Sequence, residues 1–336
     1  MVCTQAAEEA AGGWREMEPT RDLGEVADLI ADAFAEDMDE RGRAALREMR
    51  WMSRLSPLVW WLSQTDPGFR DAFSGFVWQV PSPPTRGQIV GNVNLNRAPG
   101  RRGWYIICNV VVREDHRRQG IGRCLTEHAI AQAQKLAADG VVLQVRQDNA
   151  PAMRLYTDLG FRRSSGEIEL SHQEPPSVAI SSPAGYRIRP WRPTDGEAVY
   201  QLAQRAVPEV QQWLRPVRRN AYAPGWGSRL VSWLGDRLAQ RRTYRMLALN
   251  GGRPVGMLQV QASFRGQEHR LVLLVDPEHA GQVEAALTAR GLHMLAALPP
   301  APVGIMLYVD QAAALKVFRG YGFREERILL TLKREL

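Results

Sequence analysis

The stretch that most constrains the fold runs from residue 104 to residue 125 and reads WYIICNVVVREDHRRQGIGRCL. It opens with an apolar run rich in isoleucine and valine that ends at Val112, which predicts a buried strand. After a short charged turn, apolar residues recur at helical spacing, so we expect a helix to begin near Gly120. A basic turn between a strand and a helix N-terminus gathers unpaired N–H groups and the positive end of the helix dipole at one point. The stretch therefore predicts an anion-binding site.

The turn itself carries Arg117, Gly120 and Gly122, a spacing that differs from both the dinucleotide fingerprint and the P-loop. The two glycines lack the Cβ atoms that would keep a pyrophosphate away from the backbone. The segment resembles the acyl-CoA motif of the GNAT superfamily of N-acyltransferases, R/Q-x-x-G-x-G/A. The resemblance implies that the turn holds the pyrophosphate of CoA and that the preceding strand pairs with the pantetheine arm. The CoA-binding residues implied in this stretch are Val110, Val111, Val112, Arg117, Arg118, Gln119, Gly120, Ile121 and Gly122. An ordinary strand-to-helix turn with surface arginines is the alternative.

A second motif follows about thirty residues later, where residues 149–161 read NAPAMRLYTDLGF. Pro151 suits the first turn of a short helix and Gly160 suits its end. The segment is similar to a second GNAT motif, N-x-x-A-x-x-L-Y-x-x-x-G-F. The resemblance adds Asn149 to the CoA-binding residues and makes Tyr156 the catalytic acid that protonates the leaving thiolate. The alternative is a packed tyrosine that donates one hydrogen bond.

Composition sets wider limits on the 336-residue chain, which is long enough for two domains with separate cores. A hydrophobic content of 45% and a charged content of 24% are ordinary for a globular protein. The net charge of +7 suits an anionic partner, and CoA fits it at least as well as nucleic acid. The three cysteines, Cys3, Cys108 and Cys124, are odd in number and share no metal-ligand spacing, which favours a reducing compartment. With no signal peptide in residues 1–13 and no apolar run of membrane-spanning length, we expect a cytoplasmic protein without metal, either monomer or homodimer.

The chain divides into a tail at residues 1–13, a first domain at 14–170, a linker rich in proline and polar residues at 171–185, and a second domain at 186–336. The fold class expected is α/β (α+β), with two tandem GNAT-like domains that each hold a mixed, mostly antiparallel sheet flanked by helices. In the first domain, besides the central strand and helix, we expect strands at Arg15–Met17, Phe73–Val80, Gln88–Asn94 and Val141–Val145, and a helix at Leu23–Phe34.

The second half of the chain repeats the first in weak form. Residues 141–161 return without a gap as residues 303–323, and residues 89–93 return as residues 254–258. A period this long indicates domain duplication. At the positions that match Arg117, Gly120, Gly122, Asn149 and Tyr156, the second half has Ala280, Val283, Ala285, Gln311 and Phe318. The sequence therefore predicts a degenerate second copy that does not bind CoA.

Acyl transfer to an amine needs the amine in its neutral form. A free alkylamine has a pKa of about 10.4, so roughly one molecule in a thousand is neutral at pH 7 and a general base assists the reaction. Following the family pattern, a main-chain N–H around Val111 would stabilise the oxyanion. The strand Trp104–Val112 contains no acid, and Glu36, Asp37 and Asp39 are better explained as a solvated face, so the base stays unassigned.

The function that the sequence favours is N-acetyl transfer from acetyl-CoA to a primary amine, carried by the first half of the chain. One alternative is a non-catalytic regulatory protein that binds acyl-CoA and does not need Tyr156. A second is an enzyme similar to the mycothiol-synthase-like tandem acyltransferases, in which the C-terminal half is the catalytic one. A nucleic-acid binder would use the basic surface, but the sequence contains no recognition motif for it. The acceptor amine, small molecule or peptide, and the acyl-chain length are left open.

Overall fold

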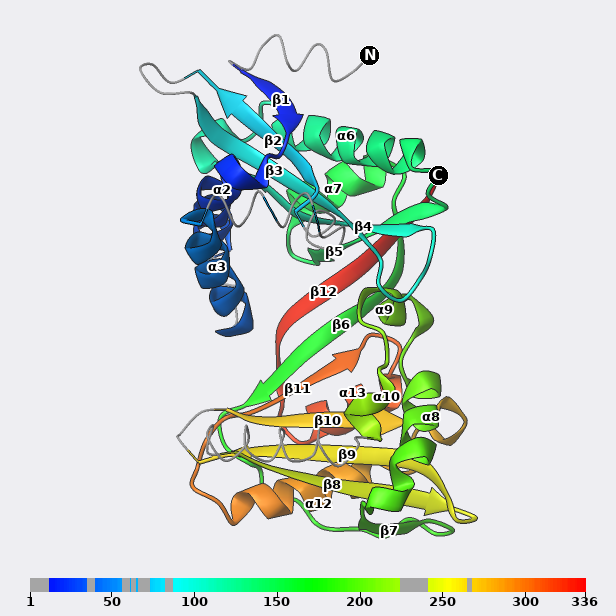
Figure 1. Ribbon diagram of the computed structural model, residues 1–336. Helices are drawn as coiled ribbons and strands as arrows, with labels where there is room; N and C mark the ends of the chain where they lie inside the picture. Colours follow the sequence, from blue (N-terminus) through cyan, green and yellow to red (C-terminus); the bar gives the residue numbers. More distant parts are fainter. Residues whose placement is uncertain are drawn as a thin grey trace. The chain divides into compact units, whose positions relative to one another are not determined.

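The computed structural model contains two compact units, shown in Figure 1. It describes residues 12–34, 40–55, 61, 65, 73–81, 87–223, 241–264 and 268–336. Unit 1 comprises Met1–Gln144, Ala150–Arg162 and Leu332–Leu336, and unit 2 comprises Val145–Asn149 and Arg163–Thr331. Neither unit is one continuous stretch of the chain. Most of the predicted tail and the acidic residues Glu36, Asp37 and Asp39 lie outside the described residues.

Unit 1 is built around a sheet in the order β1-β2-β3-β4-β5. Its elements are β1 (Gly13–Glu16), α2 (Pro19–Ala33), α3 (Glu40–Ser53), β2 (Gly75–Val80), β3 (Gln88–Arg97), β4 (Trp104–Val112), the 3₁₀ turn η1 (Glu114–His116), α6 (Ile121–Lys135), β5 (Gly140–Arg146) and α7 (Ala150–Asp158). Neighbours from β1 to β4 pair antiparallel, whereas β4 and β5 pair parallel. The sheet is therefore mixed and mostly antiparallel.

Helices cover both faces of this sheet (Figure 1). The α2 side is an apolar cluster formed by Met17, Leu23, Val26, Ala27, Leu29, Ile30, Leu46, Val77, Ile89 and Val111. On the other side α6 approaches so closely that a Cβ added to Gly91 of β3 would lie 3.0 Å from atoms of both Ile121 and Leu125. A side chain at position 91 would push α6 off the sheet, so the glycine fixes the distance between strand and helix.

Unit 2 also consists of mixed β-structure with flanking helices, but it has additional short helices. Its elements are β6 (Arg162–His172), β7 (Arg187–Pro190), η2 (Pro193–Asp195), α8 (Gly196–Ala206), α9 (Glu209–Leu214), α10 (Arg219–Tyr222), β8 (Arg241–Asn250), β9 (Arg253–Ser263), β10 (His269–Val275), η3 (Pro277–His279), α12 (Glu284–Ala296), β11 (Val303–Tyr308), α13 (Ala312–Gly320) and β12 (Arg324–Glu335). The strand order is β12-β6-β11-β10-β9-β8-β7, and β10 pairs parallel with β11 as β4 does with β5. The predicted fold class is confirmed: each unit has mixed β-structure flanked by helices, and the two units follow in tandem.

The predicted elements agree with the structure to within a few residues. The central strand is β4, with the predicted start and end, and the helix expected near Gly120 is α6, which begins at Ile121. Cys108, which lies in β4, is a free thiol. Among the described residues, no helix combines the length and the apolar character needed to cross a membrane.

The last residues of the chain complete unit 1 rather than unit 2. Leu332 is 2% exposed, and the N–H of Leu336 donates to the carbonyl of Asp139 just before β5. The guanidinium of Arg334 donates to the carbonyl of Leu159 at the end of α7 over 2.6 Å, and the ammonium of Lys333 lies 5.9 Å from the ring centre of Trp104. The C-terminus therefore supports the unit that contains the predicted anion-binding turn.

We predict that Leu332→Ala destabilises unit 1 by about 2–5 kcal/mol, the usual cost of emptying a buried leucine site. Hydrogen exchange of the amides in β4 and β5 measures this. Glu335→Ala is the matched control, because this exposed side chain makes only a surface ion pair worth about 1 kcal/mol or less. Unchanged protection of β5 in Leu332→Ala would show that the C-terminal residues do not support the unit.

Candidate active site

The turn before α6 has the geometry of an anion-binding site. Gly120, the N-cap residue, has a φ of 77°, and Arg118 also adopts the left-handed conformation with a φ of 65°. The first hydrogen bond into the helix runs from the N–H of Cys124 to the carbonyl of Gly120. The N–H groups of residues 121–123 therefore point out of the helix end, and no described residue accepts from them.

Positive charge surrounds this helix end. The side chains of Arg117 and Arg118 are exposed and form no ion pair with a described residue, although the Nε of Arg117 donates to the carbonyl of Val112 over 3.2 Å. The nearby carboxylate of Asp115 does not pair with these two arginines, because it is bonded to Arg113 and His116. Those hydrogen bonds, with Arg113 as the larger cause, lower the pKa of the Asp115 carboxyl to about 2. Two cations at the turn are left to attract a polyphosphate.

Gly122 leaves room beside the turn. A Cβ built on it would lie 3.6 Å from a methyl of Val112 and 3.9 Å from a methyl of Leu155, which are ordinary contact distances. Leu155 belongs to α7, and Arg123 of α6 forms an ion pair with Asp158 of α7 at 2.9 Å. The structure therefore brings together the end of β4, the predicted turn and the helix of the second motif.

Tyr156 lies on this α7 helix and is 6% exposed. Its ring packs edge to face against Phe161 with 5.8 Å between ring centres, and its hydroxyl has no hydrogen-bond partner within the described part of the chain. Burial raises the pKa of Tyr156 to about 12. The hydroxyl therefore keeps its proton at neutral pH and has it free to donate. Asn149, the remaining predicted site residue, is exposed and belongs to unit 2, directly before α7.

Strand β4 opens away from β5 as it approaches the turn. The parallel pairing covers only Trp104, Ile106 and the residue between them, although both strands continue well beyond this point. In the open part β4 also bulges: Asn92 of β3 pairs with Val111, but Asn94 pairs with Cys108. Asn109 sits in this bulge with a φ of 51°. The open edge leaves main-chain groups of β4, including those near Val110 and Val111, available to a ligand.

The corresponding turn of unit 2 is filled by a side chain of its own. The carboxylate of Glu284, the first residue of α12, accepts from the N–H of Gly281 at 2.8 Å and from the N–H of Val283 at 3.2 Å. Glu284 is 2% exposed and Val283 is fully buried. In the ungapped match of the two halves, Gly281 and Val283 stand at the positions of Arg118 and Gly120, so an internal carboxylate binds N–H groups of the turn that leads into α12. Sequence reasoning missed Glu284, although an acid at the first position of a helix was a signal for it.

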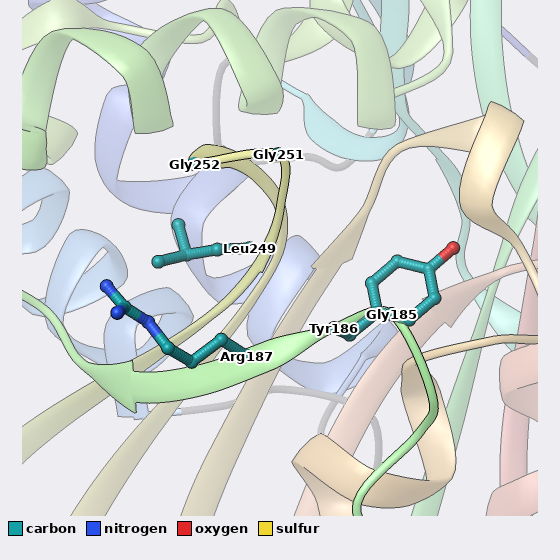
Figure 2. Close-up of a pocket in the computed structure, with 6 residues that line it drawn as sticks. All are labelled: Gly185, Tyr186, Arg187, Leu249, Gly251 and Gly252. Carbon is teal, nitrogen blue, oxygen red and sulfur yellow. The ribbon is translucent and has the colours of Figure 1, made fainter.

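Two cavities in unit 2 lack the chemistry of the turn in unit 1. One has a volume of about 400 Å³ and is bounded by Glu284 and Asp310 among mainly apolar residues. The other, of about 460 Å³, lies where β7 begins beside the β8–β9 turn (Figure 2). Figure 2 shows Tyr186 and Arg187 pointing away from each other there, and the Tyr186 hydroxyl is bound to Gln282 at 2.6 Å. No group of acidic, histidine or cysteine side chains suited to a metal occurs among the described residues.

Comparison with known proteins agrees with this geometry. A family model described as the Acetyltransferase (GNAT) family matches residues 33–161. The mycothiol acetyltransferase of Salinispora arenicola is 30% identical over 252 residues, which is 70% of this chain and 75% of that protein. The ribosomal protein bS18-alanine N-acetyltransferase of Escherichia coli is 42% identical over 57 residues, or 17% of this chain. That match spans 38% of the E. coli enzyme, well under two thirds of its length.

Solved structures share the tandem architecture. A GCN5-related N-acetyltransferase from Sphaerobacter thermophilus has a TM-score of 0.57 at 18% identity, covering 96% of this chain and 95% of that one. A tandem GNAT protein from the clavulanic acid biosynthesis pathway has a TM-score of 0.54 at 19% identity, covering 96% and 98%. At these identities the structures support the fold alone. Together with the sequence relatives they confirm the predicted family: the chain belongs to the GNAT acetyltransferases, a class of acyltransferase enzymes.

We predict that Gly122→Val weakens acetyl-CoA binding by about tenfold or more, equivalent to ~1.4 kcal/mol or more, because its branches fill the space beside the N–H donors. Gly122→Ala is the matched control: a single Cβ fits at 3.6 Å and should preserve binding. Gly120 is unsuited to this test, since its φ of 77° would strain any replacement. Calorimetric titration measures both variants, and equal affinities would place the pyrophosphate elsewhere.

Proposed function

We propose that this chain transfers an acetyl group from acetyl-CoA to a primary amine, with the site in its first half. The observation that carries the proposal is the contrast between the two helix N-termini. The α6 terminus has open N–H donors beside Arg117 and Arg118, whereas the α12 terminus is occupied by the carboxylate of Glu284. The first half thus retains what a polyphosphate requires, and the second half does not.

Each predicted residue has a role in this proposal. The turn from Arg117 to Gly122 would hold the pyrophosphate through main-chain N–H groups and arginine charge. The open edge of β4 from Val110 to Val112 would pair with the amides of the pantetheine arm, and Asn149 would contribute at the start of α7. Acetyl-CoA supplies an activated acyl group, which the protein has only to orient and polarise.

The proton movements follow from the groups around the reacting centre. A main-chain N–H near Val111 would donate to the oxyanion as the amine attacks the thioester carbonyl. The Tyr156 hydroxyl, protonated and without a partner among the described residues, would protonate the departing thiolate. No acid lies on β4, so the base that takes the proton of the amine is not assigned to a side chain.

The thiol released from acetyl-CoA reports the reaction with any amine acceptor that carries no thiol of its own. The test of the proposed function is therefore a thiol-release screen of a library of primary amines, including small polyamines, amino-sugars, amino-acid amides and short peptides. We expect at least one amine to accelerate thiol release well above the rate in buffer. A protein that binds acetyl-CoA but releases no thiol with any of them would instead be a regulatory acyl-CoA-binding protein.

Mycothiol acetylation is a second candidate, because the similarity to mycothiol acetyltransferases extends over both halves of the chain. The family pattern puts catalysis of such tandem enzymes in the C-terminal half, but here Glu284 occupies the turn of that half. Mycothiol and its unacetylated form are therefore tested in a parallel assay that detects the acetylated product by mass, because their own thiols would obscure the thiol released from acetyl-CoA. Turnover with either one that survives Tyr156→Phe would favour this candidate over the first-half site.

We predict that acetyl-CoA binds once per chain. Arg117→Ala should weaken binding by roughly 10–100-fold, since a hydrogen bond to a charged group contributes about 1.5–3 kcal/mol. Arg187→Ala is the control, because it removes an equally charged side chain from the unit 2 cavity of Figure 2. Calorimetry that finds two equivalent sites, or no effect of Arg117→Ala, contradicts the prediction.

We also predict that Tyr156→Phe lowers kcat by something like 10²–10⁴-fold, the usual effect of removing a positioned general acid. Phe318 is the natural counterpart in unit 2 and is fully buried, so a phenyl ring suits this packing. The dissociation constant of acetyl-CoA should change little. Tyr200→Phe serves as the control, since that hydroxyl accepts from Gln204 on the same helix and has no other partner among the described residues. A Tyr156→Phe enzyme with nearly full kcat would remove the hydroxyl from the mechanism.

A further inference from the structure

Three asparagines alternate along β3, at positions 92, 94 and 96. Alternate residues of a strand share one face, so the three amides line the same side of the sheet. Asn92 is fully buried and Asn94 is 4% exposed. Buried polar groups are costly unless they are hydrogen-bonded, so a row of amides on an inner face calls for a reason other than packing.

Two of these amides hold the residue that makes the β4 bulge. The Nδ2 of Asn92 donates to the main-chain carbonyl of Asn109 at 3.0 Å and to the Oδ1 of Asn94 at 2.9 Å. The Nδ2 of Asn109 donates in turn to the Oδ1 of Asn94 at 3.0 Å. Asn94 is anchored by its own Nδ2, which donates to the carbonyl of Ser74 at 3.3 Å. Asn92 and Asn94, which we call the asparagine clamp, thus grip both the backbone and the side chain of Asn109.

The conformation that they hold needs support. Asn109 has a φ of 51°, which costs energy for any residue with a Cβ, although asparagine tolerates it better than most. The bulge lies beyond Ile106, where β4 has lost its pairing with β5 and keeps only β3 as a neighbour. The strand that carries the clamp is therefore also the one that must hold the bulge in place.

Unit 2 lacks the asparagine clamp, and its corresponding strand pairing is regular. Met257 stands at the position of Asn92, and β9 pairs with β10 from Arg270 to Val275 without any shift in register. Gln259, at the position of Asn94, instead accepts from Arg245. The half with the clamp has the bulge and the open helix end, and the half without it has a regular strand and a filled helix end.

The clamp also has a cost that packing alone would not justify. The Oδ1 of Asn92 is buried and accepts no hydrogen bond from a described residue. An apolar side chain would avoid this unsatisfied acceptor, as Met257 does in unit 2. The clamp holds the strained backbone of Asn109 next to the candidate site, and its unsatisfied acceptor lowers the stability of the fold. This combination indicates a functional constraint.

We propose that Asn92 and Asn94 are positioning residues: they hold the β4 bulge so that the main-chain N–H groups after Asn109 point at the thioester carbonyl of bound acetyl-CoA. The proposal rests on the proposed function, because it assigns the clamp to that donor. The clamp affects how strongly the thioester carbonyl is polarised, whereas the pyrophosphate is bound at the α6 turn. Loss of the clamp should therefore reduce the polarisation of the carbonyl and leave the affinity for acetyl-CoA nearly unchanged.

Infrared difference spectroscopy of acetyl-CoA labelled with ¹³C at the carbonyl measures polarisation without any acceptor. In the wild-type full chain we expect the carbonyl stretch to move to lower frequency on binding. Asn92→Ala and Asn94→Ala should each lose most of this shift, while the dissociation constant of acetyl-CoA stays within about threefold, under ~0.7 kcal/mol. Asn96→Ala is the matched control, since its amide contacts the Sγ of Cys108 and makes no hydrogen bond to Asn109, and it should keep the shift.

A second variant guards against a folding defect. Glycine adopts positive φ without strain, so adding Asn109→Gly to Asn92→Ala should restore part of the shift if backbone geometry is what was lost. Shifts that persist in Asn92→Ala and Asn94→Ala, or an equal loss in Asn96→Ala, overturn the proposal while leaving the proposed function intact. A wild-type protein that does not bind acetyl-CoA overturns both.

Discussion

The interaction on which the candidate site depends is that of an anion with the unpaired N–H groups at a helix N-terminus. The chain contains two helices of this kind, α6 and α12, and the anion at their N-terminal turns has a different source. In unit 1 the left-handed Gly120 turns the backbone so that the donors of α6 face outward with no partner among the described residues. In unit 2 the carboxylate of Glu284 accepts from two N–H groups of the turn, those of Gly281 and Val283. The α6 end thus presents donors that no described residue binds, whereas the α12 turn contains an internal anion.

The separation of β4 from β5 determines the path that a ligand at the candidate anion site can follow. A ligand held by its phosphates at α6 can extend along the strand edge that β5 leaves free after Ile106. The bulge at Asn109 lies on that path, and so do the main-chain groups of Val110 and Val111. Tyr156 approaches from α7, which packs against the same turn through Leu155. Phosphate binding, carbonyl polarisation and thiolate protonation are thus assigned to three separate elements that meet within one unit.

Much of this could be predicted from the sequence because it depends on local patterns. The apolar run to Val112, the glycines at 120 and 122 and the helical spacing after them predict a strand, a turn and a helix, and the structure has all three. The repeat predicted two related folds, and the loss of arginine and glycine in the second copy predicts that it does not bind CoA, which stays a prediction. The predicted site residues from Val110 to Gly122 and Tyr156 lie within unit 1.

Other features depend on contacts between residues far apart in the chain, which a single sequence does not display. In the sequence Asn92 and Asn94 are ordinary strand positions, and only the hydrogen bonds of their amides with Asn109 reveal their role. In the sequence Glu284 is an ordinary acid at a helix start, and only the structure shows that it is buried and accepts from Gly281 and Val283. The assignment of Leu332–Leu336 to unit 1 follows from their spatial contacts, such as those of Arg334 with Leu159 and of Leu336 with Asp139, and not from any pattern in those residues.

A crystal structure of the full chain grown with CoA tests the central claim most directly, since it locates the pyrophosphate. We expect one CoA per chain, with its pyrophosphate against the N–H groups of residues 121–123 and with the Glu284 carboxylate still bound to Gly281 and Val283. A CoA whose pyrophosphate displaces Glu284 from the α12 turn, with the α6 turn unliganded, would contradict the assignment of the site to the first half.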